Sequence, residues 1–440
     1  MLQAITPIDG RYNDKVKELI PYFSEAALIK YRIFVEIEYF VRLCDVLPEL
    51  FSVTPEHIKS LRTRISKLDM ADLEYIKSIE STTNHDVKAV EYFIKDIFDQ
   101  IGLSEHKEFV HFGLTSQDIN NMAYPLMMKD CHEKVMIPII DSVINKLNDL
   151  YRLWVEVPML ARTHGQVATP TKLGKEILVF IKRIESAFII LNEVPFSCKF
   201  GGATGNLNAH YIAYPKINWN RFADNFAKDL GLLRSYPTTQ IEHYDHMAAY
   251  FDATKRINTI LIDLSRDFWQ YISMNYFTQK VNANEVGSSA MPHKVNPIDF
   301  ENAEGNLGMA NAIFEHLSAK LPISRLQRDL TDSTVMRNIG VPMAHTIISL
   351  KSLLKGLQKI DANFDVILSD LDNNWQVVAE AIQTILRREK VDKPYEKLKA
   401  LTRGEKVTQE TIADFIKTLD IKDEVKEEML KITPRTYTGL

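Results

Sequence analysis

The sequence predicts an all-α protein of three helical domains, the middle one a bundle of long helices. Two observations support this prediction. The chain has 16 glycines in 440 residues, about half the usual share of roughly 7 %, and so few turn-forming residues indicate few, long elements. Its middle part also repeats apolar residues at the spacing of helices that bury one face. We therefore divide the chain into an N-terminal, mostly helical domain (1–120), a central bundle (121–362) and a small C-terminal helical domain (363–440).

The N-terminal part has short helical patterns broken by prolines, and one of them begins near His85 and Asp86. We expect Thr82 or Thr83 to cap this helix, which places His85 and Asp86 in its first turn. The free backbone N–H groups of a first turn attract anions. From the residues alone, an anion site and an ordinary capped helix with a surface histidine explain the pattern equally well.

The central part carries apolar stripes of helical spacing at residues 173–191, 257–274 and 335–357. Thr169 and Pro170 predict the start of the first of these helices. The second stripe is apolar on more than one side, which is typical of a helix in a bundle centre or at a subunit interface. The C-terminal part is highly charged, and its short amphipathic patterns predict helices with solvated outer faces.

The composition excludes several classes of protein. The net charge of −5 argues against broad nucleic-acid binding, which needs a basic face. No stretch approaches the roughly 20 uncharged apolar residues of a membrane span, and the first residues do not resemble a signal peptide. The three cysteines lie far apart and form no C-x-x-C pattern, as expected in a reducing compartment. We expect a cytoplasmic protein that binds neither membranes nor nucleic acid.

Residues 281–297 (VNANEVGSSAMPHKVNP) form the most unusual polar stretch of the chain. A glycine and two prolines keep the segment from becoming a helix, so it indicates a loop between long helices. Ser288, Ser289, Lys294 and Asn296 supply two hydroxyls, a cation and a carboxamide. That chemistry is more than a connection needs, although an ordinary solvated loop is the alternative.

A second polar segment, residues 324–337 (SRLQRDLTDSTVMR), contains Arg325, Arg328 and Arg337 with nearby hydroxyl groups. Guanidinium groups beside hydroxyls suit a phosphate or carboxylate ligand. Surface ion pairs with the neighbouring aspartates explain the same arginines equally well.

Two further patterns do not indicate a cofactor. His243 and His246 have the spacing of a metal pair, but neither an H-E-x-x-H motif nor a cysteine partner accompanies them. The glycine-rich residues 199–210 lack the phosphate-loop pattern and the βαβ context of a dinucleotide site. We expect no metal and no other cofactor.

Together these residues suit acid–base chemistry on an anionic substrate, and elimination of an amine from a succinyl group is one such reaction. A base removes a proton beside a carboxylate, and the resulting dianion needs positive charge and N–H donors around it. A second group protonates the departing nitrogen, for which histidine, with an ordinary pKa of about 6.5, is suited. Ser288 can act as the base only if Lys294 and loop amides stabilise its oxyanion.

The motifs also resemble a known family. The segment GSSAMPHKVNP is similar to the GSSxMPxKxNP loop of the fumarase/aspartase superfamily, and its continuation IDFENAEGNLG resembles the adenylosuccinate lyases, particularly the longer bacterial form. Further matches follow in the family's order across most of the chain: GRY (10–12), TTNHDVKAVEYF (82–93), HFGLTSQDINN (111–121), RTHGQVATPT (162–171), TTQIE (238–242) and RDLTDSTVMRN (328–338). One departure is Asn284, where a glycine is common in the family.

The resemblance implies specific roles for several residues. Ser288 matches the general base, and His164 matches the general acid. Glu301 matches the residue that orients this histidine, while Lys294 and Asn296 match residues that hold the succinyl carboxylates.

Other positions match the substrate-binding residues of the family. His85 matches a histidine near the substrate phosphate and the leaving group, which leaves open whether it shares the protonation with His164. The remaining matched positions are Arg11, Tyr12, Asn84, Asp86, Thr115, Ser116, Gln240, Asn302, Arg328, Ser333, Thr334, Val335, Met336 and Arg337.

The resemblance further implies a homotetramer whose active sites are each built from three chains. The implied reactions release fumarate from adenylosuccinate and from the succinylated aminoimidazole carboxamide ribotide. Another lyase of the superfamily, such as argininosuccinate lyase, fumarase or aspartase, is an alternative. His293, where fumarases and aspartases usually have glycine, argues against it. The other alternative is a scaffold of the same fold without activity, although the matched catalytic residues are all present.

Overall fold

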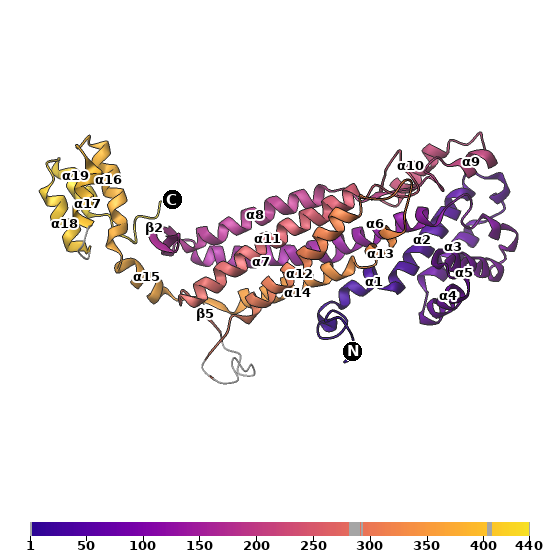
Figure 1. The fold of residues 1–440 in the computed structure, drawn as a ribbon, viewed down its shortest axis with the longest axis horizontal. Helices are drawn as coiled ribbons and strands as arrows, with labels where there is room; N and C mark the ends of the chain where they lie inside the picture. Colours follow the sequence, from indigo (N-terminus) through magenta and orange to yellow (C-terminus); the bar gives the residue numbers. More distant parts are fainter. Residues whose placement is uncertain (1, 281–290, 292–293, 403–406, 440) are drawn as a thin grey trace. The chain divides into compact units, whose positions relative to one another are not determined.

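The computed structural model describes residues 2–280, 291, 294–402 and 407–439, and these are mainly helical (Figure 1). The chain folds into two compact units. Unit 1 comprises residues 1–140, 187–259 and 305–351, and unit 2 comprises residues 141–186, 260–304 and 352–440. The three consecutive domains expected from the sequence remain a prediction.

Unit 1 contains the N-terminal helices and two later groups of short elements. Its α-helices are α1 (Ile20–Phe23), α2 (Glu25–Cys44), α3 (Pro55–Ser66), α4 (Met70–Thr83), α5 (Asp86–Gln100), α6 (Ser116–Cys131), α9 (Asn208–Ala213), α10 (Trp219–Asp229) and α13 (Thr331–Met336). Its other elements are the parallel strands β3 (Ser197–Cys198) and β4 (Leu233–Arg234) and the short 3-10 or π-helical turns η1 (Asn13–Lys15), η2 (Lys17–Leu19), η3 (Pro48–Leu50), η4 (Ser104–Phe109) and η5 (His132–Met136).

Unit 2 combines short antiparallel strands with the C-terminal helices. Its strands are β1 (Pro158–Thr163), β2 (Gln166–Lys172), β5 (Phe277–Gln279) and β6 (Ile360–Ala362), and they pair as β1–β2 and β5–β6. Its helices are α15 (Phe364–Asp372), η6 (Trp375–Val378), α16 (Ala379–Arg388), α17 (Pro394–Thr402), α18 (Gln409–Thr418) and α19 (Asp423–Leu430).

The longest helices have residues in both units, because the division falls within them. They are α7 (Ile137–Trp154), α8 (Leu173–Glu193), α11 (Asp245–Ser273), α12 (Ile298–Lys320) and α14 (Gly340–Lys359).

The core of unit 1 forms around α2, which contacts α3, α5 and α6. Ser24 caps α2 by accepting a hydrogen bond from the backbone N–H of Ala27 at 3.1 Å. Phe40 of α2 packs edge to face against Phe98 of α5, with ring centroids 4.7 Å apart. α4 and α5 lie beside each other (Figure 1), so the junction between them is held on a packed core.

The predicted apolar stripes lie on helices, but the start of one stripe and the continuity of another were predicted wrongly. The stripe at 173–191 lies on α8, but Thr169 and Pro170 do not begin that helix, because they belong to strand β2. The stripe at 335–357 is interrupted, since α13 ends at Met336 and α14 begins at Gly340. The all-α class is confirmed, with small two-stranded sheets as additions. Among the described residues, no helix is both long and apolar enough to cross a membrane.

Candidate active site

The junction between α4 and α5 carries the first predicted site residues. α4 ends at Thr83, and Asn84 follows with a left-handed backbone (φ 52°), which asparagine tolerates better than most residues. The cap of α5 is His85, whose Nδ1 accepts a hydrogen bond from the backbone N–H of Lys88 at 3.0 Å. The predicted cap at Thr82 or Thr83 was therefore wrong: both lie in α4, and Asp86 is the first residue of α5.

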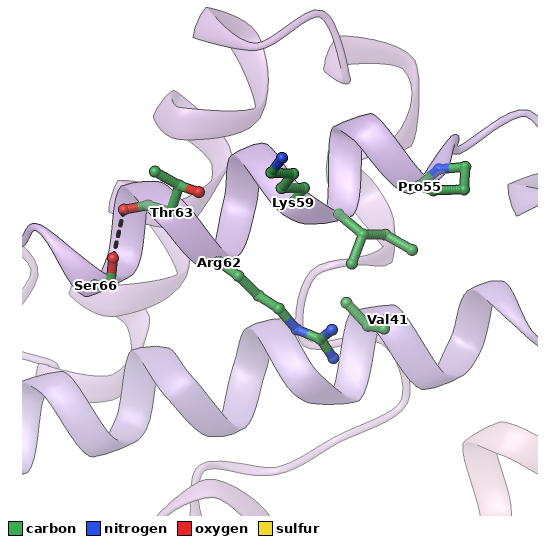
Figure 2. Close-up of a pocket in the computed structure, with 7 residues that line it drawn as sticks. Val41, Pro55, Lys59, Arg62, Thr63 and Ser66 are labelled. Atoms are coloured by element: carbon green, nitrogen blue, oxygen red, sulfur yellow. Dashed lines mark hydrogen bonds between the residues drawn. The ribbon is translucent and has the colours of Figure 1, made fainter.

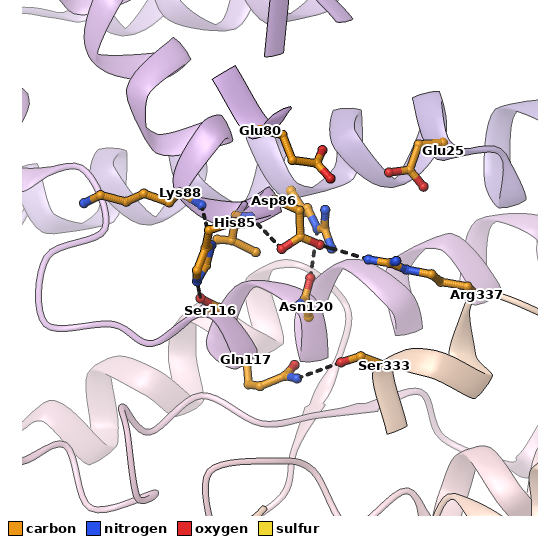
Figure 3. Close-up of polar contacts among 12 residues, drawn as sticks. Glu25, Glu80, His85, Asp86, Lys88, Ser116, Gln117, Asn120, Ser333 and Arg337 are labelled. Atoms are coloured by element: carbon orange, nitrogen blue, oxygen red, sulfur yellow. Dashed lines mark hydrogen bonds and ion pairs between the residues drawn. The ribbon is translucent and has the colours of Figure 1, made fainter. Parts of the chain in front are cut away.

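This cap determines the chemistry of the His85 ring. Because Nδ1 accepts a hydrogen bond it carries no proton, so the neutral ring has its proton on Nε2. Nε2 lies 3.4 Å from the hydroxyl oxygen of Ser116 at the start of α6 (Figure 3). The ring is exposed, so His85 presents an N–H donor to solvent beside two helix N-termini.

Asp86 is the centre of a charged cluster on the other side of this junction (Figure 3). Its Oδ2 accepts hydrogen bonds from Arg32 at 2.7 Å and from Arg337 at 3.2 Å. Arg32 is buried and also donates from Nε to Asn120 at 2.8 Å. Burial by itself raises the pKa of Asp86, but the two guanidinium groups and the Val87 N–H outweigh it and hold the pKa below its usual value. Asp86 therefore stays ionised and holds Arg337 at the site.

The segment 328–337 joins the same region through Ser333. Gln117 of α6 donates to the Ser333 hydroxyl at 3.3 Å, as Figure 3 shows. Arg328 donates to the same hydroxyl at 3.4 Å and to the side-chain oxygen of Gln240 at 3.1 Å. The buried Asp332 accepts from the Ser333 backbone N–H at 2.7 Å and from the Tyr244 hydroxyl at 2.9 Å. The middle of this segment is thus held by the buried Asp332, and its first residue, Arg328, by Gln240.

The two sequence explanations for the arginines each apply to different residues. Arg325 is exposed and pairs with Asp329 at 3.0 Å, so it forms the ordinary surface ion pair. Arg328 and Arg337 instead contact other predicted site residues, Gln240 and Asp86.

A buried ion pair lies at the start of α6, next to the residues described above. Lys199 and Asp118 are both fully buried, and their Nζ and Oδ1 atoms lie 2.6 Å apart. Asp118 also accepts backbone hydrogen bonds from Gly201 at 2.8 Å and from Thr115 at 2.9 Å. Burial lowers the pKa of Lys199, although the Asp118 carboxylate opposes the shift. The glycine-rich residues 199–210 are therefore attached to the start of α6 by a structural ion pair.

Unit 1 thus brings together most of the predicted binding residues. The residues that contact one another are His85 with Ser116, Asp86 with Arg337, and Arg328 with Gln240 and Ser333. The other predicted residues here are their neighbours along the chain, namely Asn84, Thr115, Thr334, Val335 and Met336. Sequence reasoning missed the residues that hold them, which are Arg32, Gln117, Asp118, Asn120, Lys199, Tyr244 and Asp332. Charged residues inside apolar stretches, such as Arg32 in α2, were the available signal.

The N-terminal pair Arg11 and Tyr12 also belongs to unit 1. Their segment, with Asp9 and Asn13, lines a pocket of 240 Å³ that Arg337 also lines. The backbone N–H of Tyr12 donates to the carbonyl of Pro7 at 2.8 Å, which turns the segment back on itself.

His164 lies in unit 2, at the tip of the β1–β2 hairpin. Thr163 pairs with Gln166, so His164 and Gly165 form a two-residue turn. Both have positive φ, 54° and 75°, as the tight type I′ hairpin turn requires. A left-handed backbone is uncommon outside glycine, and histidine adopts it more readily than most other residues. The hairpin was not predicted, and it presents an exposed imidazole.

Unit 2 also contains the other predicted groups of the acid–base chemistry. Glu301, in the first turns of α12, accepts a hydrogen bond from the Trp269 indole at 3.0 Å. Lys294 is exposed, and Gln279 at the end of β5 donates to the backbone carbonyl of Val295 at 3.1 Å. This bond fixes the backbone between Lys294 and Asn296. Asn302 follows one position after Glu301 in the same helix. Ser288, Ser289, Asn284 and His293 lie outside the described residues.

A well-formed pocket of unit 1 lies away from all of these residues. It has a volume of 560 Å³ and is lined by Val41 of α2 and by residues of α3 that include Lys59 and Arg62 (Figure 2). Arg62 is held by an ion pair with Glu38 at 2.6 Å. The pocket is therefore a groove between two helices, distinct from the predicted site.

His243, one of the histidine pair at 243 and 246, contacts a backbone carbonyl. Nε2 of His243 donates to the carbonyl of Pro237 at 2.9 Å. In the part of the chain that the structure describes, no group of three or more His, Cys, Asp or Glu side chains is arranged to hold a metal ion.

Comparison with known proteins identifies the family. A family model described as "Lyase" matches residues 10–312, and one described as "Adenylosuccinate lyase C-terminal" matches residues 324–438. The chain is 58% identical to the adenylosuccinate lyase of Dictyostelium discoideum and 47% identical to that of Escherichia coli (strain K12). Each alignment covers 100% of this chain and 97% of the relative. The chain belongs to the adenylosuccinate lyase family.

Membership confirms the prediction made from the motifs: the chain is a lyase of the fumarase/aspartase superfamily. Solved structures of the same fold include a fumarate lyase from Mesorhizobium sp. BNC1, with a TM-score of 0.75 and 18% identity over 97% of this chain and 95% of that chain. A 3-carboxy-cis,cis-muconate lactonizing enzyme from Pseudomonas putida has a TM-score of 0.75 and 17% identity over 96% and 94%. At these identities the similarity shows the fold alone.

Proposed function

We propose that this adenylosuccinate lyase family member catalyses two β-eliminations of purine biosynthesis. One splits adenylosuccinate into AMP and fumarate, and the other splits the succinylated aminoimidazole carboxamide ribotide into the carboxamide ribotide and fumarate. The observation that carries the proposal is the cluster in unit 1, where His85, Ser116, Arg328 and Arg337 surround two helix N-termini. Such a set of N–H and guanidinium donors suits the phosphate of a nucleotide.

The chemical step needs a base, an acid and stabilisation of a carbanion. In our proposal Ser288 removes the proton from the carbon beside a succinyl carboxylate, and Lys294 and Asn296 hold the carboxylates as negative charge develops. His164 then gives a proton to the nitrogen as the C–N bond breaks, which releases fumarate and the amine. Glu301 is proposed to orient His164.

The state of the His85 ring supports a division of labour between the two histidines. To act as a proton donor in its cationic form, His85 needs a proton on Nδ1, which breaks the cap of α5. Its neutral ring can still donate a hydrogen bond from Nε2 while Nδ1 keeps the cap of α5. We therefore propose that His85 binds the substrate as a neutral donor and that His164, at an exposed turn, is the general acid.

We also propose a cytoplasmic homotetramer in which three chains build each active site. Apolar side chains exposed on the long helices support association, among them Ile189 and Ile190 of α8, each 58% exposed, and Met309 of α12, 54% exposed. The cysteines, which form no disulfide, support a reducing compartment.

The first experiment measures the ultraviolet absorbance of purified protein mixed with adenylosuccinate, with fumarate assayed in the product. Loss of substrate with equimolar fumarate is the expected result. No turnover would contradict the proposal, and turnover of argininosuccinate, malate or aspartate instead would assign another activity of the superfamily. A folded protein that converts none of these substrates would be a scaffold.

Shared sites are tested separately by mixing two inactive variants. Ser288→Ala and His164→Asn chains, unfolded and refolded together, should regain activity if one active site takes these residues from different chains. Each variant refolded alone is the control. A mixture as inactive as its components, or a monomer mass by light scattering, would contradict the shared site.

A further inference from the structure

The hairpin that carries His164 depends on contacts outside itself. A two-stranded hairpin is marginally stable alone. The pairing register of β1 and β2 also shifts between Leu160 and Arg162, so the tip lies beyond an irregularity that weakens its connection to the base. Only Arg162–Val167 and Thr163–Gln166 pair beyond this point among the described residues.

The base of the hairpin is held by apolar packing. Leu160 is 1% exposed and belongs to a buried cluster with Leu371 of α15 and Val378 and Ile382 of the next helical turns. The Thr169 hydroxyl of β2 also donates to Glu380 of α16. Beyond the register shift, Val167 of β2 packs against the same cluster, whereas its partner on β1, Arg162, is held by a charged group.

On the β1 side, the tip is held by the carboxylate of Asp370. Arg162, two residues before His164, donates from Nη2 to Asp370 Oδ2 at 2.5 Å. The buried Tyr276 donates its hydroxyl to the same oxygen, and Asn374 donates to Oδ1 at 3.2 Å. Burial and the Asp370 carboxylate raise the pKa of Tyr276, so its hydroxyl remains a donor. Asp370 is thus held from two sides while it holds Arg162.

The helix that presents Asp370 is itself anchored. β6 pairs with β5 and leads directly into α15. The backbone N–H of Asn363, the cap of α15, donates to the carbonyl of Tyr276 at 2.8 Å. Next to the start of α15, Arg162 and Gly165 line an open pocket of 860 Å³, so the turn has solvent on one side. Its orientation therefore depends on the Arg162–Asp370 contact.

We propose that Asp370 is a positioning residue that fixes the orientation of His164 through Arg162. This inference rests on the role of His164 as general acid in the proposed function. Removing the carboxylate releases the turn, and a misplaced proton donor slows the chemical step while substrate binding is unchanged.

The test compares Asp370→Asn with Asp372→Asn. Asp372 lies on the same helix and pairs with the exposed Arg435 at 2.8 Å, away from the hairpin, which makes it a matched control. We expect Asp370→Asn to lower kcat about 10- to 100-fold with KM nearly unchanged. Hydrogen exchange of residues 158–172, followed by mass spectrometry, should become faster, and the melting temperature should stay close to that of the wild type. Asp372→Asn should change none of these.

A wild-type kcat in Asp370→Asn, or a lowered kcat with unchanged exchange in the hairpin, would overturn the inference. If Asp370→Asn fails to fold, Arg162→Gln tests the same contact from the other side with the same expected outcomes. Arg162→Lys keeps the charge but loses the planar guanidinium, and should lie between wild type and Arg162→Gln. An inactive wild-type protein would refute the proposed function instead. The hydrogen-exchange measurement would still test whether the Arg162–Asp370 contact holds the hairpin.

Discussion

The two histidines of the proposed site are supported in different ways. His85 is part of a helix cap, so one ring nitrogen is engaged and the ring is fixed in one tautomer. His164 lies at the tip of a two-residue turn with an exposed ring, and a side chain two residues away holds the turn. A ring that closes a helix is suited to binding in one protonation state. A ring on a turn can gain and lose a proton without breaking a backbone hydrogen bond, so the support around each histidine indicates its role.

The largest expected effect is on His164. Asparagine tolerates a left-handed backbone, and Asn-Gly is a favoured type I′ turn, so His164→Asn removes the imidazole without disturbing the hairpin. We expect kcat to fall about 10²–10⁴-fold, while the melting temperature is unchanged or slightly higher. The absorbance assay measures kcat, and thermal unfolding measures the melting temperature. Turnover near that of the wild type would show that His164 is not the acid.

The support under the His85 region is tested by Lys199→Met. The variant leaves the buried Asp118 carboxylate without its charged partner, which should cost about 3–5 kcal/mol of unfolding free energy. Urea denaturation measures the loss. The control is Lys182→Met, which breaks the exposed pair with Glu185 on α8 and should cost about 0.5 kcal/mol or less. Equal losses in the two variants would mean that the buried pair is not a support.

Two variants of His85 separate its structural and functional roles. His85→Ala loses the cap of α5 and should cost about 1 kcal/mol of stability. His85→Asn supplies a capping oxygen and should keep that stability. Both lack the Nε2 donor, so both should raise KM for adenylosuccinate. If His85→Asn binds substrate as well as the wild type does, the donor role is wrong.

The smallest effect is a pH dependence near the start of α6. Burial lowers the pKa of His111, but the Glu36 carboxylate at 2.6 Å, together with those of Glu91 and Asp118, raises it more, so the net shift is upward. The stability contributed by this pair is fully present below the unfolded pKa of about 6.5 and is lost as the pH rises through the higher folded pKa. The difference in unfolding free energy between wild type and His111→Gln should therefore shrink with rising pH. A difference that grows with pH would contradict the assignment.

The sequence predicted the long helices better than it predicted the caps and turns between them. The stripes on α8 and α11 follow from periodicity, because a helix that buries one face must repeat its apolar residues. The cap of α5 was misassigned because histidine is not among the usual capping residues, whereas Thr82 and Thr83 are. The hairpin was missed because residues 158–172 are partly polar and contain Pro170, which argues against a strand.

The convergence of the site could not be derived from spacing. Gln117 meets Ser333 across 216 positions, and Arg337 meets Asp86 across 251. Such contacts depend on how helices pack, and the periodic pattern of a helix does not name its partner. Family motifs supplied the list of site residues, but some of the groups that hold them, such as Asp370 and Lys199, belong to no motif quoted for the resemblance.

The Lys199–Asp118 pair also sets an order of events during folding. The two residues are 81 positions apart, so α6 leaves the ribosome well before the lysine that neutralises its aspartate. An unpaired carboxylate is costly to bury, and it therefore stays hydrated until the glycine-rich segment arrives. Water leaves the start of α6 only when both charges enter together. The start of α6 therefore reaches its final packing only once residues 199–210 are in place.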